Sequence, residues 1–189
     1  MRILKAERHR RMPWKNGGGE TIEIAVHPPG AGLSGFDWRI SMASVVADGP
    51  FSRFEGIDRT LAILAGRGMD LEIDGMGQQS LTAGSAPLAF PADAPTHARL
   101  HDGAITDLNV MTRRGVCAHR VSFVPSLGAR IELGGRWGFV IPLAPCRVAM
   151  DATEVEVEAG DAIALTAPAL SLRLSSSTPV AAYVVEIHD

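Results

Sequence analysis

The sequence predicts an all-β protein. Turn signals such as Pro28-Pro29-Gly30, Asp48-Gly49-Pro50 and Asp74-Gly75 recur at short intervals and leave little room for helices. Between the turns, apolar and polar residues alternate, as they do in strands with one face on a core. No stretch shows the apolar spacing of an amphipathic helix of three turns. Many short alternating runs with regular turns are typical of a β-sandwich or β-barrel.

Individual strands can be placed in chain order from this alternation. Apolar residues share one face in four early and late runs, which are Ile22, Ile24 and Val26; Met69, Leu71 and Ile73; Val155 and Val157; and Leu170, Leu172 and Leu174. The last run, Val180 to Ile187, is apolar on both faces over much of its length. We therefore expect it to be a central strand of its sheet.

The segment from Phe36 to Leu64 is the most informative part of the chain. It begins with a strand in which Trp38, Ile40 and Met42 point to one side and Arg39 and Ser41 to the other. A loop dense in acids and arginines follows this strand. Paired charges so close to a half-buried strand predict one end of a barrel with a polar lining that holds a small anion.

A weak internal repeat suggests two similar halves. Leu81–Phe90 resembles Val157–Thr166, since each reads apolar, polar, Ala-Gly, polar, Ala and then apolar. Its glycines suit a tight corner because glycine adopts positive φ. If the match is not due to chance, the chain holds two β-barrel halves, residues 1–115 and 116–189, joined near Arg113-Arg114-Gly115.

Composition excludes several classes of protein. The chain has 189 residues and a net charge of −3, which argues against broad nucleic-acid binding. Cys117 and Cys146 have neither CxxC nor zinc-ligand spacing and fit a reducing cytosol. The N-terminus lacks the apolar core of a signal peptide, and no apolar run approaches the ~20 residues that span a bilayer. We expect a cytoplasmic protein with no membrane or nucleic-acid partner.

The histidines do not form a recognisable metal site. No His-x-His occurs, and His97 and His101 lie four residues apart, a spacing that suits a helix better than a strand. With Asp93, Asp102 and Asp107 nearby, the alternatives are a metal site or a solvated hairpin, and we favour the hairpin. No G-x-S-x-G pattern appears either. We expect no metal, no cofactor and no covalent catalysis.

Arg39 and Arg59 are the main candidates for ligand binding. A guanidinium group holds a carboxylate through two parallel hydrogen bonds. If the polar strand face lines a barrel, both side chains converge on its interior. If that face is outside, they are solvated ions of little energetic weight. A third alternative is an internal ion pair, such as Arg59 with Asp48 or Asp37.

Two further stretches carry polar groups. The Asn16-Gly17-Gly18-Gly19 loop is either an anion-binding nest of N–H groups or a wide turn before the strand Thr21–Val26. Lys15 and Asn16 flank it. Asn109 shares a strand face with Asp107, and inward-facing polar groups need hydrogen-bond partners.

Three motifs identify a family resemblance. MPWKNGGGETIEIA (Met12 to Ala25), FDWRISMASVVADGPFSRFEGIDRTLAIL (Phe36 to Leu64) and TDLNVMTRRG (Thr106 to Gly115) resemble the HutD/Ves family, in order and at similar spacing. The resemblance implies a bicupin fold, two cupin-like β-barrels in one chain. It also implies binding of a histidine-degradation intermediate, such as urocanate or formylglutamate, and restraint of that pathway's expression. No enzymatic activity is firmly attached to the family.

Residues and resemblance together predict a non-enzymatic protein that binds a small carboxylate and senses or buffers it. The expected pocket lies in the N-terminal half and uses seven residues, which are Lys15, Asn16, Arg39, Ser41, Ser52, Arg59 and Asn109. One alternative is a cupin-like isomerase or lyase that acts on a similar acid through pairs such as Asp48 or Asp58 with an adjacent arginine. Another is a structural partner protein, for example a homodimer formed through an exposed sheet edge.

Overall fold

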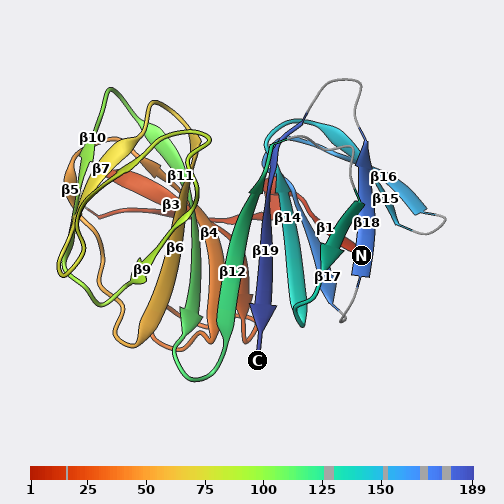
Figure 1. The fold of residues 1–189 in the computed structure, drawn as a ribbon, viewed down its shortest axis with the longest axis horizontal. Coiled ribbons are helices and arrows are strands. Elements are labelled where there is room, and N and C mark those ends of the chain that lie inside the picture. The colour runs from red at the N-terminus through yellow and green to blue at the C-terminus, as the bar shows by residue number, and fades with distance from the viewer. Residues whose placement is uncertain (16, 126–129, 151–152, 167–169, 176–179) are drawn as a thin grey trace. The chain divides into compact units, whose positions relative to one another are not determined.

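The computed structural model describes the chain except residues 16, 126–129, 151–152, 167–169 and 176–179. The described residues are strands, turns and a single 3₁₀ turn, η1 (Ala6–Arg8), so the all-β prediction is confirmed. They form two compact units, shown in Figure 1. We call residues 10–118 the N-terminal unit, and residues 1–9 with 119–189 the C-terminal unit. Among the described residues, no helix has the length and hydrophobicity needed to cross a membrane.

Two antiparallel sheets make up the N-terminal unit. The larger has the strand order β2-β3-β4-β11-β6-β9 and the smaller β5-β10-β7-β8. Their bounds are β2 (Arg10–Pro13), β3 (Gly19–His27), β4 (Trp38–Val45), β5 (Gly49–Pro50), β6 (Ile57–Ala65), β7 (Met69–Ile73), β8 (Gly77–Leu81), β9 (Leu88–Pro91), β10 (Thr96–Leu100) and β11 (Ile105–Arg113).

The core of the N-terminal unit lies between these two sheets. Leu61 and Ile63 of β6 pack in one cluster with Met69 and Leu71 of β7, and all four side chains are at most 2% exposed. The inner face of the large sheet is therefore the face that carries Leu61 and Ile63.

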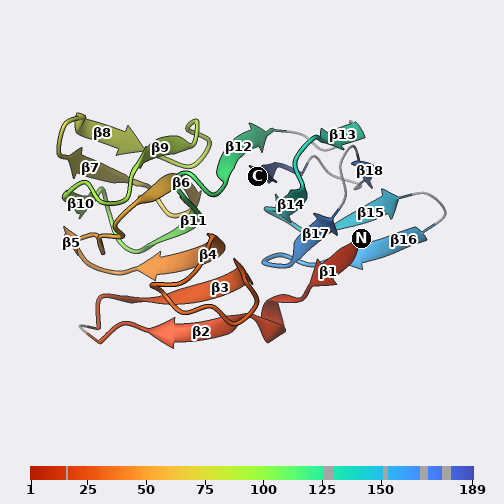
Figure 2. The same cartoon turned by 90° about the horizontal axis from the view of Figure 1, so that it is seen from below.

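The C-terminal unit also contains two sheets, with the orders β1-β17-β14-β19-β12 and β13-β18-β15-β16. Their bounds are β1 (Arg2–Leu4), β12 (Ala118–Val124), β13 (Arg130–Leu133), β14 (Trp137–Pro142), β15 (Cys146–Met150), β16 (Thr153–Val157), β17 (Ala162–Thr166), β18 (Leu170–Ser175) and β19 (Ala182–His188). Figure 2 shows β1 beside β17, with which it pairs. The first nine residues thus group with residues 119–189, whereas the sequence placed them with residues 10–115.

The strand order of the chain repeats itself. Strands β4 to β11 form the orders β4-β11-β6-β9 and β5-β10-β7-β8, and strands β12 to β19 form β12-β19-β14-β17 and β13-β18-β15-β16. The sequence repeat falls on equivalent places, the turns from β8 to β9 and from β16 to β17. Gly84 and Gly160 in these turns both have φ +85°.

One strand departs from the predicted alternation. Ile22 of β3 lies opposite Met42, but Val26 lies opposite Arg39, because a β-bulge interrupts the pairing between Glu23 and Ala25. An extra residue in one strand moves the following side chains to the other face. The prediction that Ile22 and Val26 share a face was therefore wrong. The late strand β19 lies between β14 and β12, in agreement with its expected interior position.

Candidate functional site

Three adjacent strands place polar side chains on the inner face of the N-terminal unit. Asp107, Asn109 and Met111 share one face of β11, because side chains alternate along a strand. Their partners in register are Ala43, Ser41 and Arg39 on β4 and Ile63, Leu61 and Arg59 on β6. Since Ala43, Leu61 and Ile63 belong to the core cluster, this face points inward. We call Arg39, Ser41, Arg59, Asp107 and Asn109 the inner polar patch.

Arg59 is a buried cation that forms no salt bridge with a carboxylate among the described residues, although the charge of Asp107 acts on it. Its side chain is 4% exposed, and its Nη2 donates to the carbonyl of Ser52 at 3.2 Å. Three aromatic rings surround the guanidinium, with centroids at 5.4, 5.4 and 5.8 Å for Phe51, Phe54 and Phe90. Among the described residues, Arg59 Nε has no hydrogen-bond partner. Burial lowers the pKa of Arg59 to about 10, so it stays charged at neutral pH.

Arg39, by contrast, is already neutralised. Its Nε donates to Glu23 Oε2 at 2.7 Å, and the two side chains are 5% and 12% exposed. On sequence grounds we considered an internal ion pair of Arg59 with Asp48 or Asp37. The described residues show an internal ion pair at Arg39 instead, with Glu23 as its partner. The two arginines that the sequence treated alike therefore differ in whether a carboxylate of the protein already pairs with them.

Breaking the Arg39–Glu23 pair is expected to destabilise the protein. Glu23→Gln leaves a buried guanidinium without its counter-ion, and we expect a loss of about 3 kcal/mol in the free energy of unfolding. The double variant Glu23→Gln/Arg39→Met should lose less than the sum of the single losses, because neither charge remains. Urea denaturation measures both.

The exposed pair Arg11–Glu20 of the same sheet supplies the control. Removal of Arg11 should cost less than about 1 kcal/mol, since solvent screens a surface pair. Equal losses at Arg11 and Glu23 would contradict the assignment of a buried, energetically important pair.

Asp107 is the second incompletely paired charge of the patch. It is 1% exposed, and its Oδ1 accepts a hydrogen bond from Asn109 Nδ2. Its Oδ2 is buried with no hydrogen-bond partner among the described residues. Burial raises the pKa of Asp107 to about 7, although Arg59 and hydrogen bonds from Ala43 and Asn109 favour the charged form.

The other predicted site residues divide into three groups. Ser41 is 1% exposed and lies opposite Asn109, so both belong to the patch. Ser52 contributes its carbonyl oxygen, while its side chain is exposed. Asn16 lies outside the described residues.

Lys15 does not join the arginines. It is exposed in the turn between β2 and β3, at the end of the sheet where Gly19 pairs with Val45. Arg39 lies six residues from Val45 along β4, which corresponds to about 20 Å. The expectation that Lys15 closes one side of an arginine pocket therefore does not match its position.

The glycine loop before β3 is shaped by backbone contacts. The N–H of Gly17 donates to Trp14 O at 3.1 Å, and the carbonyl of Gly18 accepts from Val46 N. A Cβ on Gly19 would overlap the carbonyl oxygen of Ser44 on the adjacent strand. These contacts are those of a turn that leads into a strand, and the close approach of Ser44 explains the glycine at position 19.

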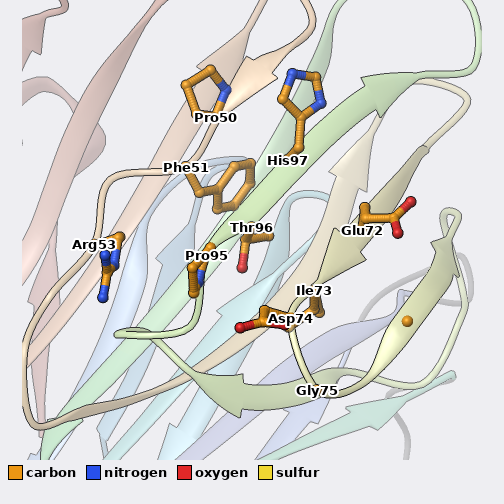
Figure 3. Close-up of a pocket in the computed structure, with 11 residues that line it drawn as sticks. Pro50, Phe51, Arg53, Glu72, Ile73, Asp74, Gly75, Pro95, Thr96 and His97 are labelled. Carbon is orange, nitrogen blue, oxygen red and sulfur yellow. The ribbon is translucent and has the colours of Figure 1, made fainter.

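A surface pocket lies on the small sheet. It is lined mainly by residues of β5, β7 and β10 and the turns beside them, which are Pro50, Phe51, Arg53, Glu72, Ile73, Asp74, Gly75, Gly77, Pro95, Thr96 and His97. Figure 3 shows the ring of Phe51 inside this pocket, between Arg53 on one side and Glu72 on the other. Phe51 thus lines the pocket and also contacts the guanidinium of Arg59.

His97 and His101, which were considered for a metal site, contact different groups. His97 lines the surface pocket, and His101 Nε2 lies 2.8 Å from Asp70 Oδ1. Within the described part of the chain, no three His, Cys, Asp or Glu side chains are close enough to hold a metal ion.

The arginines at the expected join act within the N-terminal unit. Arg113 donates to the carbonyls of Phe36 and Ser34, and Arg114 pairs with Asp58 and Asp93. These contacts fasten the loops at the ends of β4, β6 and β9. Both arginines therefore have partners within the N-terminal unit.

Sequence reasoning missed Glu23 and the aromatic groups on Arg59. Glu23 had a usable signal, since it lies on the polar face of an alternating run next to the strand of Arg39. No sequence signal pointed to the rings of Phe51, Phe54 and Phe90. All three contact Arg59, but Phe90 lies on a strand more than 30 residues further along the chain than the loop that carries the other two.

Comparison with known proteins now adds to this geometry. The HutD family profile matches residues 6–183. The chain belongs to the HutD family. This confirms the resemblance drawn from the three motifs, and the family is associated with histidine utilisation.

Curated relatives match a shorter region. An uncharacterised 21.2 kDa protein in the hutC 3′ region of Pseudomonas putida is 41% identical over 111 residues, which cover 59% of this chain and 57% of that protein. Protein Ves from Citrobacter koseri is 39% identical over 116 residues, which cover 59% of each chain. The matched region thus spans less than two thirds of these relatives.

Solved structures match most or all of the chain. A conserved protein of unknown function from Pseudomonas aeruginosa PAO1 has a TM-score of 0.91 at 32% identity, covering 100% of this chain and 98% of that chain. HutD from Pseudomonas fluorescens SBW25 has a TM-score of 0.83 at 30% identity, covering 99% and 97%. A cupin 2 conserved barrel domain protein from Leptotrichia buccalis reaches 0.58 at 12% identity, covering 88% of each chain. The fold is therefore cupin-like.

Proposed function

We propose that this HutD-family protein binds a small organic acid at Arg59 and thereby senses or buffers an intermediate of histidine degradation. Urocanate and formylglutamate are the ligands that the family resemblance suggests. In this proposal, binding restrains expression of the histidine-utilisation genes and involves no catalysis.

The observation that carries the proposal is the state of Arg59. A buried guanidinium normally has a carboxylate partner, because an unpaired charge in an apolar environment is costly. Here the described neighbours of Arg59 supply one carbonyl, a thioether and three aromatic rings. A ligand carboxylate would supply the missing negative charge and accept the free Nε–H.

Access to Arg59 runs through the segment that covers it. Residues 51–54 contribute two rings and a carbonyl to Arg59, while Ser52 and Arg53 are exposed. Two backbone hydrogen bonds hold this segment, from Phe51 N to Thr96 O and from Phe54 N to Ala92 O. In the proposed binding step, Phe51 moves aside and joins the surface pocket to the inner polar patch.

The names of relatives support the choice of pathway. One is described by its place in the hutC 3′ region, and another is HutD with a structure described for a formate condition. We place the protein in the cytoplasm, in keeping with Cys117 and Cys146, which form no disulfide.

We further propose that the chain is a bicupin in which the N-terminal unit alone binds ligand. The repeated strand order supports two cupin-like halves. In the C-terminal unit, the buried carboxylate of Asp161 accepts from Lys5 Nζ and Ala6 N, and that of Glu186 accepts from Gly134 N and Arg120. These carboxylates are paired by the protein itself, in contrast to Asp107 and Arg59.

Thermal unfolding with and without urocanate or formylglutamate tests the proposal. At about 100 times its Kd, a ligand adds about 2.7 kcal/mol, which raises the Tm of a chain this size by roughly 5–10 °C. Arg59→Met should abolish the shift, because it removes the charge and keeps most of the side-chain volume.

Arg99→Met, an exposed arginine on β10, is the matched control and should keep the full shift. No shift with either acid in the unmodified protein would overturn the ligand class. A full shift in Arg59→Met would overturn the site.

A further inference from the structure

The inner polar patch contains two unsatisfied atoms of opposite kinds. Arg59 Nε is a donor without an acceptor, and Asp107 Oδ2 is an acceptor without a donor, as far as the described residues show. Both side chains are at least 96% buried. Buried polar atoms without partners are rare in folded proteins, because leaving them unpaired is energetically unfavourable. Two such atoms on one sheet face point to a bound molecule that serves both.

Register gives the spacing between the two groups. Arg59 lies opposite Met111, and Asp107 lies four residues from Met111 on β11, so their backbone positions are about 13 Å apart along the strand. Among the described residues the two groups form no salt bridge, although each charge acts on the pKa of the other. Asn109 and Leu61 lie between them in register.

A simple carboxylate satisfies only one end of this arrangement. It accepts from Arg59, but it leaves Asp107 Oδ2 without a donor and adds a second negative charge to the same buried face. Two donors of the patch are already engaged, since Asn109 Nδ2 donates to Asp107 Oδ1 and Arg39 Nε to Glu23. A donor on the ligand would satisfy Oδ2.

We infer that the ligand is an organic acid with an N–H or O–H group remote from its carboxylate, bound with the carboxylate on Arg59 and the donor on Asp107. This inference rests on the proposed function and names the ligand class for the same site. The imidazole N–H of urocanate meets the requirement, and so does the formamide N–H of formylglutamate when its γ-carboxylate lies on Arg59. Asp107 thereby selects among acids, while Arg59 binds any of them.

A pair of isosteric acids tests the inference. Urocanate and 3-(2-furyl)acrylate have similar shape and the same carboxylate, but furan has no N–H. Isothermal titration calorimetry should give urocanate a Kd about 10-fold to 100-fold lower in the unmodified protein, since a hydrogen bond to a charged group contributes ~1.5–3 kcal/mol. In Asp107→Asn the ratio should fall to within about 3-fold, with furylacrylate affinity kept or improved.

The outcomes separate the inference from the proposed function. Equal affinity for both acids in the unmodified protein would overturn the role of the donor and leave acid binding at Arg59 intact. Binding of neither acid would overturn both. Persistence of the urocanate preference in Asp107→Asn would overturn the assignment to Asp107. The ligand comparison in the unmodified protein stands even where the variant folds poorly.

Discussion

Asp107→Asn is expected to make the unliganded protein more stable at neutral and alkaline pH. Burial raises the pKa of Asp107 to about 7 in the folded state, from an ordinary value of 3.8 in the unfolded chain. The folded state therefore holds a proton that the unfolded state has lost between these pH values. The contribution of Asp107 to the free energy of unfolding is therefore most favourable below about pH 4. It becomes less favourable as the pH rises to about 7.

Asparagine resembles the protonated carboxyl but does not ionise. The variant should match the native protein near pH 4 and exceed it by up to about 4 kcal/mol above pH 7, from roughly three pKa units at ~1.36 kcal/mol each. Urea denaturation at pH 4.5, 6 and 8 measures the difference. A difference in stability that does not grow with pH would contradict a buried, unsatisfied Asp107.

Asp161 provides a control of opposite sign. Burial acts to raise its pKa, but hydrogen bonds from Lys5, Ala6 and Glu158 outweigh burial and lower it below the ordinary value. Its charged form therefore stabilises the fold above the unfolded pKa, and this contribution disappears as the pH falls through the folded pKa. Asp161→Asn should be destabilising at pH 7 and lose that effect in acid.

Gly19→Ala is expected to destabilise the fold severely. A Cβ at this position would overlap the Ser44 carbonyl oxygen and lie 3.2 Å from the ring of Trp14. Strand β4, which carries Ser44, cannot move away easily because it is paired with β11 on its other side. We expect a loss of about 3–5 kcal/mol from overpacking together with backbone strain. Thermal and urea unfolding would measure it.

Gly17 in the same loop is the matched control. It has φ +70° but no atom within 4 Å of an added Cβ. Gly17→Ala should therefore cost only about 1 kcal/mol, the penalty of a left-handed conformation without a clash. Similar losses at both positions would show that conformation, and not the approach of Ser44, makes Gly19 necessary.

Much of the fold follows from local pattern. The alternation around Trp38 to Met42 correctly divided β4 into two faces, and the Ala-Gly repeat fell on equivalent turns of the two strand series. The motifs around Met12–Ala25 and Phe36–Leu64 led to the right family. Each of these signals depends on residues that are neighbours in sequence, so a single chain displays them directly.

The site was predictable only in part. Arg39, Arg59 and Asn109 share the inner face, as the alternation suggested. Lys15 lies at the far end of the same sheet because β2 and β3 form a hairpin whose turn lies beyond that end, which the order of residues does not reveal.

By itself, the sequence determined that the chain is all-β, that arginines alternate with apolar residues on its strands, and that it resembles HutD. The tertiary structure alone decided which arginine keeps an unneutralised charge. The pairing of β3 with β4 brings Glu23 to Arg39, whereas aromatic rings from a loop and from β9 surround Arg59. The physical reason is that alternation is set within a strand, but charge pairing depends on register between strands and on which distant side chains exclude water.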